Sequence, residues 1–389
     1  MTNKLSEVAL KDIIDIRDGT HDSPKYVNEG FPLITSKNIK DGEIDFSNVN
    51  LISEEDYKKI NKRSEVSNGD IIMPMIGTIG NPMIVNTEKK FAIKNVALFK
   101  FDSDRKLNNS YLYYYLKSDL FHQQINFVKR GGTQSFISLS DIRNLRVPIF
   151  NTNYQQKVVK ILKKAENLIE LRKAQIVALF ELMQSIFFEM FGDLRENNNW
   201  DKVPLSELIE VDTKVIKTIS DYQDYNLVGI DNIEKISGKL INLRTIKESK
   251  VSGSKYYFKS EHILYSKIRP YLNKVAIPNF EGLCSTDAYP LKVKEGKANK
   301  AFIAFILRSD AFVKYAVSNS KGANIPRIDK KQLLNYLTIN PNIDLQNDFE
   351  VKYKFIQSKI ELLEYSLNEL EINFKSLTQG AFKGDYSND

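Results

Sequence analysis

The chain has 389 residues, 42% of them hydrophobic, which is enough for two or more domains with buried cores. A single cysteine, Cys284, excludes an internal disulfide and a cysteine-based zinc site and is typical of a reducing cytoplasm. The net charge of +7 is uneven: residues 193–343 carry +7, residues 1–152 and 153–192 carry +2 each, and residues 344–389 carry −4. A cationic globular segment favours an anionic partner, most commonly nucleic acid.

The sequence carries no signal for export or for membrane insertion. Residues 1–7 lack the apolar core of a secretory signal peptide. No uninterrupted apolar run approaches the ~20 residues that cross a bilayer. We therefore expect a cytoplasmic protein without a membrane partner.

Residues 1–152 are expected to form a mixed α/β domain. Short strand-like segments alternate with polar turns that contain glycine or proline. A tyrosine-rich helix is predicted over residues 111–127, and a basic, glycine-rich loop follows at residues 129–135.

A long helix with a coiled-coil seam is predicted over residues 153–192. Ten positions spaced alternately by four and three residues run from Val158 to Met190, and nine of them are apolar. The mean spacing of 3.5 residues is the period of a helix that packs along another helix. The exception is Arg172, which we interpret as a side chain with a solvated head; control of helix register is the alternative.

The second half of the chain repeats this plan. A second domain is expected over residues 193–343 and a second long helix over residues 344–389. A ladder of ten apolar or aromatic positions runs from Phe349 to Ala381, each 191 residues after its counterpart. The constant offset indicates an internal duplication rather than two unrelated amphipathic helices, and matched seams most simply pack against each other. The central seam residues are Leu162, Ile169, Ile176, Leu179, Ile360, Leu363, Leu367 and Leu370.

The predicted fold class is therefore α+β, with two pseudo-repeated mixed α/β domains separated by two long antiparallel coiled-coil helices. Two similar domains held apart by paired helices suit a ligand that repeats along one direction. Duplex DNA with two half-sites is the obvious example.

The loops of both domains carry side chains suited to DNA. Arginine and lysine bind phosphates or guanine edges, and asparagine and glutamine read adenine. Any one of these side chains could instead be an ordinary solvated group, and the loops 129–135 and 321–327 are the favoured ones. The candidates are Arg17, Thr20, His21, Lys37, Asn38, Lys129, Arg130, Thr133 and Gln134 in the first domain, and Lys255, Lys267, Arg269, Tyr271, Lys274, Lys321, Asn324 and Arg327 in the second.

Catalytic motifs in the sequence are weak. Asn81-Pro82 begins a methyltransferase-type motif, but no aromatic residue follows, so a turn is the simpler interpretation. Asp70 with Glu88-Lys89-Lys90 matches a nuclease pattern loosely, and a charged hairpin tip explains the second part. The sequence has no phosphate-binding loop for ATP, and its three histidines are far apart. We predict a non-catalytic chain with no metal or cofactor of its own.

The chain resembles the specificity subunit of Type I restriction–modification enzymes over nearly its whole length. The resemblance rests on the 191-residue repeat, on the two long helices and on several local phrases. One departure is that Ile325-Pro326-Arg327-Ile328 in the second half has Ser135-Phe136-Ile137-Ser138 at the corresponding place in the first half. The first domain is therefore expected to contact DNA differently. The phrases are Asp18-Gly19-Thr20-His21 with Pro24, Phe31-Pro32-Leu33-Ile34, Gly69-Asp70-Ile71-Ile72, residues 263–272, and Ile325-Pro326-Arg327-Ile328.

This resemblance implies a DNA-binding subunit in which each domain is a target-recognition domain for half of a bipartite site. It also implies that the paired helices act as a spacer and help to dock two adenine-methylating modification subunits, and that a motor-nuclease restriction subunit joins the complex. S-adenosylmethionine, ATP and Mg would then be bound by the partner subunits. The alternatives are a stand-alone DNA endonuclease and a DNA-binding regulator without enzyme partners.

Overall fold

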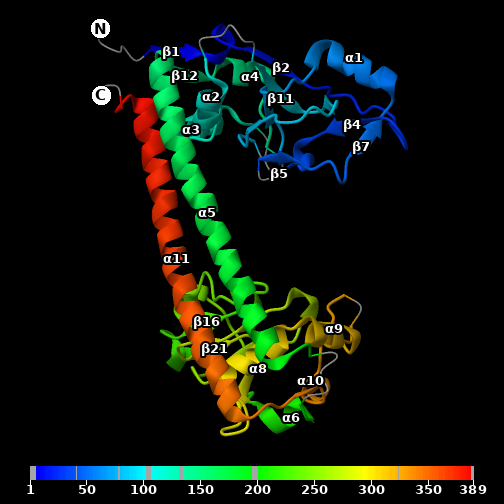
Figure 1. The fold of residues 1–389 in the computed structure, drawn as a ribbon, viewed down its shortest axis with the longest axis vertical. Coiled ribbons are helices and arrows are strands. Elements are labelled where there is room, and N and C mark those ends of the chain that lie inside the picture. Colours follow the sequence, from blue (N-terminus) through cyan, green and yellow to red (C-terminus); the bar gives the residue numbers. More distant parts are fainter. Residues whose placement is uncertain are drawn as a thin grey trace. The chain divides into compact units, whose positions relative to one another are not determined.

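The computed structural model divides the chain into two compact units. Unit 1 contains residues 1–174 and 365–389, and unit 2 contains residues 175–364. Each unit holds one globular domain together with segments of both long helices (Figure 1). The residues that the structure describes are 6–40, 42–77, 79–101, 107–130, 135–194, 200–322 and 324–386.

The domain of unit 1 is built on two four-stranded sheets. The first is antiparallel, with the order β2 (Asp15–Asp18), β11 (Val96–Lys100), β8 (Ile71–Pro74) and β9 (Met83–Ile84). The second has the order β10 (Ala92–Ile93), β4 (Phe31–Ile34), β7 (Asn50–Ile52) and β3 (Tyr26–Val27), with β10 and β4 parallel. Two short pairs join β1 (Ser6–Ala9) to β12 (Arg146–Ile149) and β5 (Ile39–Lys40) to β6 (Glu43–Ile44). The helices are η1 (Leu10–Asp12), η2 (Ser36–Asn38), α1 (Glu54–Ser64), α2 (Asn109–Leu116), α3 (Asp119–Val128) and α4 (Leu139–Asn144).

The domain of unit 2 follows the same plan, with five strands instead of four in its second sheet. An antiparallel sheet has the order β14 (Ile209–Val211), β22 (Ala288–Val293), β19 (His262–Ser266) and β20 (Val275–Ala276). The five-stranded sheet has the order β15 (Val215–Ile216), β18 (Lys255–Phe258), β21 (Gly282–Cys284), β16 (Asn226–Val228) and β17 (Arg244–Thr245), and β13 (Lys202–Pro204) pairs with β23 (Leu337–Ile339). The helices are α6 (Leu205–Leu208), η3 (Ser220–Tyr222), η4 (Ile230–Asn232), α7 (Ile246–Ser249), η5 (Pro270–Leu272), α8 (Lys300–Arg308), α9 (Asp310–Ser318) and α10 (Lys330–Leu334).

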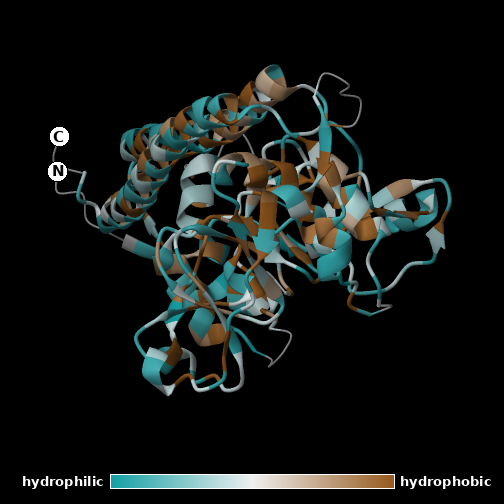
Figure 2. Cartoon of the chain, turned by 90° about the horizontal axis from the view of Figure 1, so that it is seen from below, coloured by the Kyte–Doolittle hydropathy of each residue, from teal (hydrophilic) through white to brown (hydrophobic). Residues whose placement is uncertain are grey.

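The two predicted long helices are present as α5 (Thr152–Phe191) and α11 (Ile343–Lys383). The two sets of ten seam positions, from Val158 to Met190 and from Phe349 to Ala381, are all buried or half-buried. Arg172 is one of the half-buried ones. On the opposite face, Leu171 and Leu362 are 63% and 60% exposed. Figure 2 shows hydrophobic residues in brown and hydrophilic residues in teal along these helices. The burial therefore follows the predicted 3.5-residue period.

Within each unit, α5 and α11 run antiparallel and contact each other. In unit 1, the hydroxyl of Tyr154 donates to the carbonyl oxygen of Ala381 at 2.7 Å. In unit 2, Met183 of α5 is buried in one cluster with Ile356 and Ile360 of α11. The predicted pairing of the seams is thereby confirmed.

The ends of both long helices are anchored in the domain cores. In unit 1, the ring of Phe382, at the end of α11, lies 5.2 Å from Tyr111 of α2. In unit 2, the ring of Phe191, at the end of α5, lies 4.9 Å from Phe302 of α8. Phe382 stands at the repeat offset from Phe191, and Phe302 at the same offset from Tyr111, so the duplication extends into the cores.

A buried glutamine makes the same pair of hydrogen bonds in each unit. The side-chain oxygen of Gln155 accepts the N–H of Asn108 at 2.9 Å, and its amide donates to the carbonyl oxygen of Phe150 at 2.9 Å. The corresponding bonds of Gln346 measure 2.9 and 2.8 Å and join the residues at the repeat offset. Because buried polar groups need partners, these bonds hold each long helix to its domain in one orientation.

By length and composition alone, α5 is also apolar enough to cross a membrane, which the sequence analysis did not anticipate. This is weak evidence, because the core helix of a soluble protein meets the same criterion. Four of its apolar residues lie in domain cores: Val158 and Leu162 in unit 1, and Phe187 and Phe191 in unit 2.

Candidate nucleic-acid interface

In unit 2, two loops are joined side by side by backbone hydrogen bonds. They are residues 266–273, after β19, and residues 320–328, before α10. The N–H of Arg269 donates to a carbonyl oxygen of the second loop at 2.7 Å. The second loop closes on itself through two bonds of 2.9 Å between Lys321 and Arg327. Loops that are distant in sequence thus form one backbone framework.

This framework brings together four of the predicted DNA-binding residues, which we call the cation quartet: Lys267, Arg269, Lys321 and Arg327. Three are exposed, and Lys267 is half-buried with its ammonium 5.3 Å from the ring centre of Tyr289. Within the described part of the chain, no carboxylate forms an ion pair with any of the four. Because their positive charges are not compensated by the protein, the quartet can bind phosphate oxygens or guanine edges.

Unit 1 contains the same framework with different side chains. The N–H of Gly77 donates to the carbonyl oxygen of Ser135 at 3.1 Å, and Arg130 and Phe136 exchange backbone bonds of 2.9 and 2.8 Å. The quartet positions are therefore occupied by Met75, Gly77, Arg130 and Phe136. Arg130 is the single cation among them, and its guanidinium lies 3.6 Å from the carboxylate of Asp141.

This comparison corrects the alignment expected from the sequence by one residue. The sequence places Ser135–Ser138 opposite Ile325–Ile328, which sets Arg327 against Ile137. The backbone bonds instead set Arg327 against Phe136.

From the sequence, Asn81-Pro82 is interpreted as a turn, and Met75 and Gly77 are not among the predicted DNA-binding residues. The sequence segments Asp70-Ile71-Ile72, which leads into β8, and His262-Ile263-Leu264, which begins β19, correspond in the two halves of the chain. That correspondence is the signal that would have identified the segment around Gly77 as the counterpart of loop 266–273.

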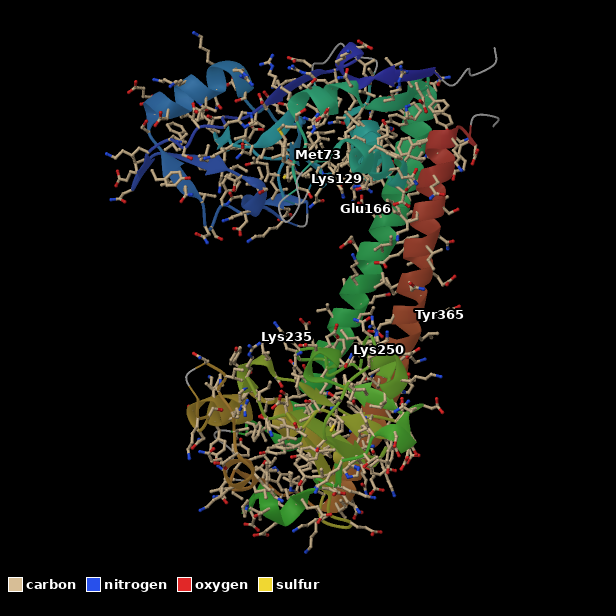
Figure 3. All side chains as sticks on the ribbon, turned by 180° about the vertical axis from the view of Figure 1, so that it is seen from behind. Met73, Lys129, Glu166, Lys235, Lys250 and Tyr365 are labelled. Carbon is tan, nitrogen blue, oxygen red and sulfur yellow. The ribbon has the colours of Figure 1, made fainter. Side chains whose placement is uncertain are left out.

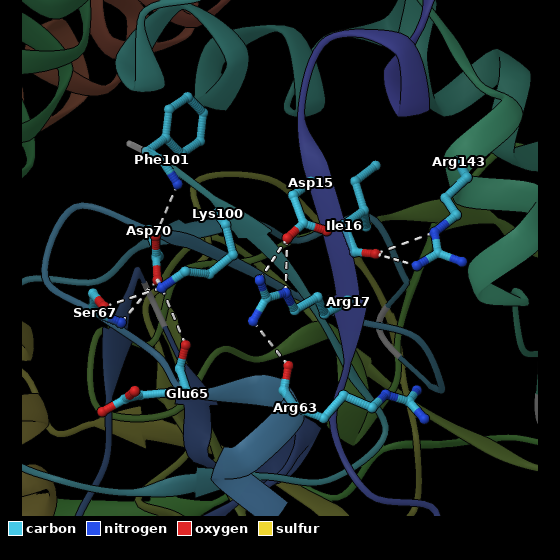
Figure 4. A network of polar contacts seen from close by, with 10 residues as sticks. All are labelled: Asp15, Ile16, Arg17, Arg63, Glu65, Ser67, Asp70, Lys100, Phe101 and Arg143. Atoms are coloured by element: carbon cyan, nitrogen blue, oxygen red, sulfur yellow. Dashed lines mark hydrogen bonds and ion pairs between the residues drawn. The ribbon is translucent and has the colours of Figure 1, made fainter. Parts of the chain in front are cut away.

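The candidates in β2 and directly after it form a second group in unit 1. Arg17 is half-buried, and its guanidinium contacts the carboxylate of Asp15 at 2.7 Å (Figure 4). The two ring nitrogens of His21 lie 2.9 Å from the carboxylate of Asp18 and 2.8 Å from the amide oxygen of Asn95. Thr20, between these groups, accepts the N–H of the residue two positions later. Contacts within the protein therefore orient these side chains.

The structure contradicts two of the candidates. Asn38 is 7% exposed, and its amide bonds the N–H of Thr35 and the carbonyl oxygen of Asn48. Lys274 is 8% exposed, and its ammonium donates to the carbonyl oxygen of Ile230 at 2.7 Å. Both side chains stabilise the fold and are not available to DNA.

The remaining candidates vary in exposure. Lys37, Lys129 and Asn324 are exposed, and Figure 3 labels Lys129 at the end of α3. Tyr271 is 55% exposed in loop 266–273. Lys255 is half-buried and donates to two carbonyl oxygens of the preceding turn. Thr133 and Gln134 lie outside the described residues.

Asp70, the first residue of the possible nuclease pattern, has a structural role. It is fully buried, and its carboxylate accepts the Lys100 ammonium at 2.6 Å and the N–H groups of Ser67 and Phe101 at 2.8 and 2.9 Å (Figure 4). These bonds join β8 to β11. Glu88 is exposed, and its carboxylate accepts the side-chain amide of Asn68 at 3.4 Å, so the pattern does not form a site.

Replacing Asp70 with alanine is expected to lower the free energy of unfolding by about 3–5 kcal/mol, because the half-buried ammonium of Lys100 then loses its counter-charge. The matched control is Glu54→Ala, which removes an exposed ion pair with Lys58 and should leave the stability nearly unchanged. Urea unfolding of the purified chain measures both. Equal shifts in the two variants would contradict this role for Asp70.

The described residues contain no group of three or more His, Cys, Asp or Glu side chains placed to hold a metal ion. Cys284 is buried in β21, and its burial raises the pKa of the thiol to about 12. The thiol is therefore protonated at neutral pH and acts as a packed side chain.

The family model of the Type I restriction modification DNA specificity domain matches the chain twice, over residues 3–180 and 197–372. The chain belongs to this family. Its two matches correspond to the two pseudo-repeated halves. Members of the family are the specificity subunits of Type I restriction–modification enzymes: they recognise DNA, assemble with other subunits and are not themselves catalytic.

Individual relatives agree with this assignment. The chain is 23% identical to the Type I restriction enzyme EcoDI specificity subunit of Escherichia coli over 318 residues, which is 72% of this chain and 70% of the relative. It is 26% identical to the MjaVIII specificity subunit of Methanocaldococcus jannaschii over 176 residues, which is 43% of this chain and 41% of the relative.

Two solved structures share the fold. The S subunit of a Type I system from M. genitalium has a TM-score of 0.54 and 15% identity, with 98% of this chain and 96% of that chain covered. A chain from a study of complex assembly and conformational transition of the type I R-M system has a TM-score of 0.57 and 15% identity, with 99% of both chains covered. The α+β fold predicted from the sequence is thereby confirmed.

Proposed function

We propose that this specificity subunit reads a bipartite DNA target, with one half bound by each domain. The observation that carries this proposal is the shared loop framework, in which the same backbone bonds support different side chains in the two units. Equivalent loops can approach DNA in the same manner, whereas different side chains select different bases. Two half-sites of unlike sequence follow from that arrangement.

We further propose that the chain directs adenine methylation by two modification subunits, and cleavage when a restriction subunit is bound. Exposed apolar side chains on the long helices support a docking role, because such side chains mark protein interaction surfaces when they gather on one element. The helix pair presents them in both units. They are Leu168, Leu171, Tyr365 and Ile372 in unit 1, and Val177, Leu182, Phe188, Val351, Phe355 and Leu362 in unit 2.

In this proposal, the partner subunits bind S-adenosylmethionine, ATP and Mg, and the complex works in the cytoplasm. Asp70 is bonded within the fold and the thiol of Cys284 is buried, so neither is available for catalysis. This supports the proposal that the chain supplies DNA recognition and its partners supply the chemistry. The chemistry then takes place on the modification and restriction subunits, at a position that this chain selects.

Mapping adenine methylation across the genome, with and without this chain, tests the proposal. We expect one two-part adenine motif to lose its methylation when the chain is deleted and to regain it when the chain is restored. An unchanged methylation map would contradict the proposal and favour a DNA-binding regulator. Cleavage of DNA by the pure chain with Mg²⁺ would favour an endonuclease.

A further inference from the structure

We propose that the cation quartet of unit 2 is a phosphate clamp without an equivalent in unit 1, and that Arg269 keeps a strained backbone conformation for this contact. The inference rests on the proposed function, since it takes DNA to be the ligand of these loops. It adds an asymmetry between the two domains: unit 2 supplies most of the electrostatic attraction, and unit 1 supplies little.

The two frameworks can be compared position by position because their backbone hydrogen bonds correspond. The N–H of residue 328 donates to the carbonyl oxygen of Lys267 at 3.0 Å, and the N–H of Ile137 donates to that of Met75 at 3.0 Å. The N–H of Arg269 donates to the carbonyl oxygen of Pro326, and the N–H of Gly77 donates to that of Ser135, so Arg269 and Gly77 are equivalent. At four equivalent positions, unit 2 therefore has four cations and unit 1 has one.

The backbone of Arg269 is left-handed, with φ of 49° and ψ of 58°. Glycine adopts this region freely, whereas an L side chain in it brings Cβ close to the following carbonyl. The equivalent residue of unit 1 is Gly77, which has φ of 79°. Unit 2 thus places an arginine where the same framework uses glycine.

Strain at this position is part of a local cluster. Asn273, at the end of the same loop, and Ile236, in a neighbouring loop, also have positive φ, of 48° and 66°. The N–H of Ile236 donates to the carbonyl oxygen of Asn273 at 3.0 Å. Backbone outliers that persist in a well-bonded framework gather at functional sites. Because glycine would relieve the strain at position 269, the side chain of Arg269 must contribute something other than stability.

The surroundings of Arg269 favour a phosphate over a base edge. Reading a guanine needs a guanidinium that neighbouring side chains hold in one orientation. Among the described residues, no side chain bonds the Arg269 guanidinium, which is exposed. An unrestrained cation on a backbone framework that carries three more cations suits a phosphate, which accepts many approach directions. The segment 193–343 also carries the largest share of the positive charge.

Arg269→Gly gives a test in which stability and binding move in opposite directions. The matched control is Lys250→Gly, since Lys250 is also an exposed cation of unit 2 with a left-handed backbone, φ 48°, and lies outside the quartet (Figure 3). Neither variant should lower the thermal midpoint of the chain. The two variants differ in which cation they remove, so only Arg269→Gly should weaken DNA binding.

Binding is measured with the complete methyltransferase complex and a duplex that carries the mapped motif, over a range of salt concentrations. Arg269→Gly should weaken binding about tenfold near 0.15 M salt. It should also reduce the slope of log affinity against log salt by about 1. Lys250→Gly should bind as the unmodified complex does, and Arg269→Lys should recover both the affinity and the slope.

Three results would overturn the clamp. A changed base preference in duplexes selected by the Arg269→Gly complex would make Arg269 a base reader. A lowered thermal midpoint would make it a structural residue, and unchanged affinity and slope would remove it from the interface. Failure of the proposed function looks different, because the unmodified complex would then select no two-part motif at all.

Discussion

Replacing Leu363 and Leu367 with aspartate is expected to separate α11 from α5 and to abolish assembly with partner subunits. Both leucines are half-buried ladder positions, Leu363 in unit 2 and Leu367 in unit 1. Two carboxylates in an apolar seam lose hydration without gaining a counter-charge. We expect the free energy of unfolding to fall by more than about 4 kcal/mol, which is a large part of the stability of a marginally stable domain.

Circular dichroism and gel filtration of the co-expressed complex measure this effect. The matched control is Leu362→Asp, which makes the same change on the exposed face of the same helix and should alter stability by about 0.5 kcal/mol or less. A doubly substituted chain with a normal thermal midpoint and a normal complex would refute the seam as the basis of helix pairing.

Reversing two charges of the quartet, with Lys267→Glu and Arg269→Glu, is expected to weaken DNA binding by unit 2 strongly. Each substitution replaces attraction to phosphate with repulsion. We expect affinity for the target duplex to fall more than about 100-fold at moderate salt. The loss should be smaller at high salt, where exposed charges are screened.

Lys247→Glu with Lys250→Glu is the control for this experiment, because it changes the net charge of unit 2 equally at two exposed residues outside the quartet. Electrophoretic mobility shifts over several salt concentrations compare the two variants. If the quartet variant binds as tightly as the control, loops 266–273 and 320–328 are not the DNA-binding face of unit 2.

The seams and the duplication could be predicted from the sequence because helices that pack along each other have apolar residues at a regular spacing. The repeat offset holds through both helices, and it makes Gln155 and Gln346 equivalent, which their matching hydrogen bonds confirm. The sheets could not be predicted in this way. Their strands are two to six residues long, too short for alternation to set their order or register.

The candidate site was predicted in part. Lys267, Arg269, Lys321 and Arg327 were identified by residue type, and the fold brings them together. Asn38 and Lys274 were chosen for the same reason and are buried, because residue type does not show which way a side chain points. The unit 1 loop that contains Met75 and Gly77 was missed, since neither side chain suggests DNA binding. Its role follows only from the backbone bonds that it shares with unit 2.

The central claim is that two domains read two separate half-sites. The most direct measurement is selection of duplexes from a random pool by the complete complex, followed by sequencing of the bound fraction. We expect one motif with two specified parts separated by a spacer of fixed length and unspecified sequence. A single continuous motif, or no enriched motif, would contradict it.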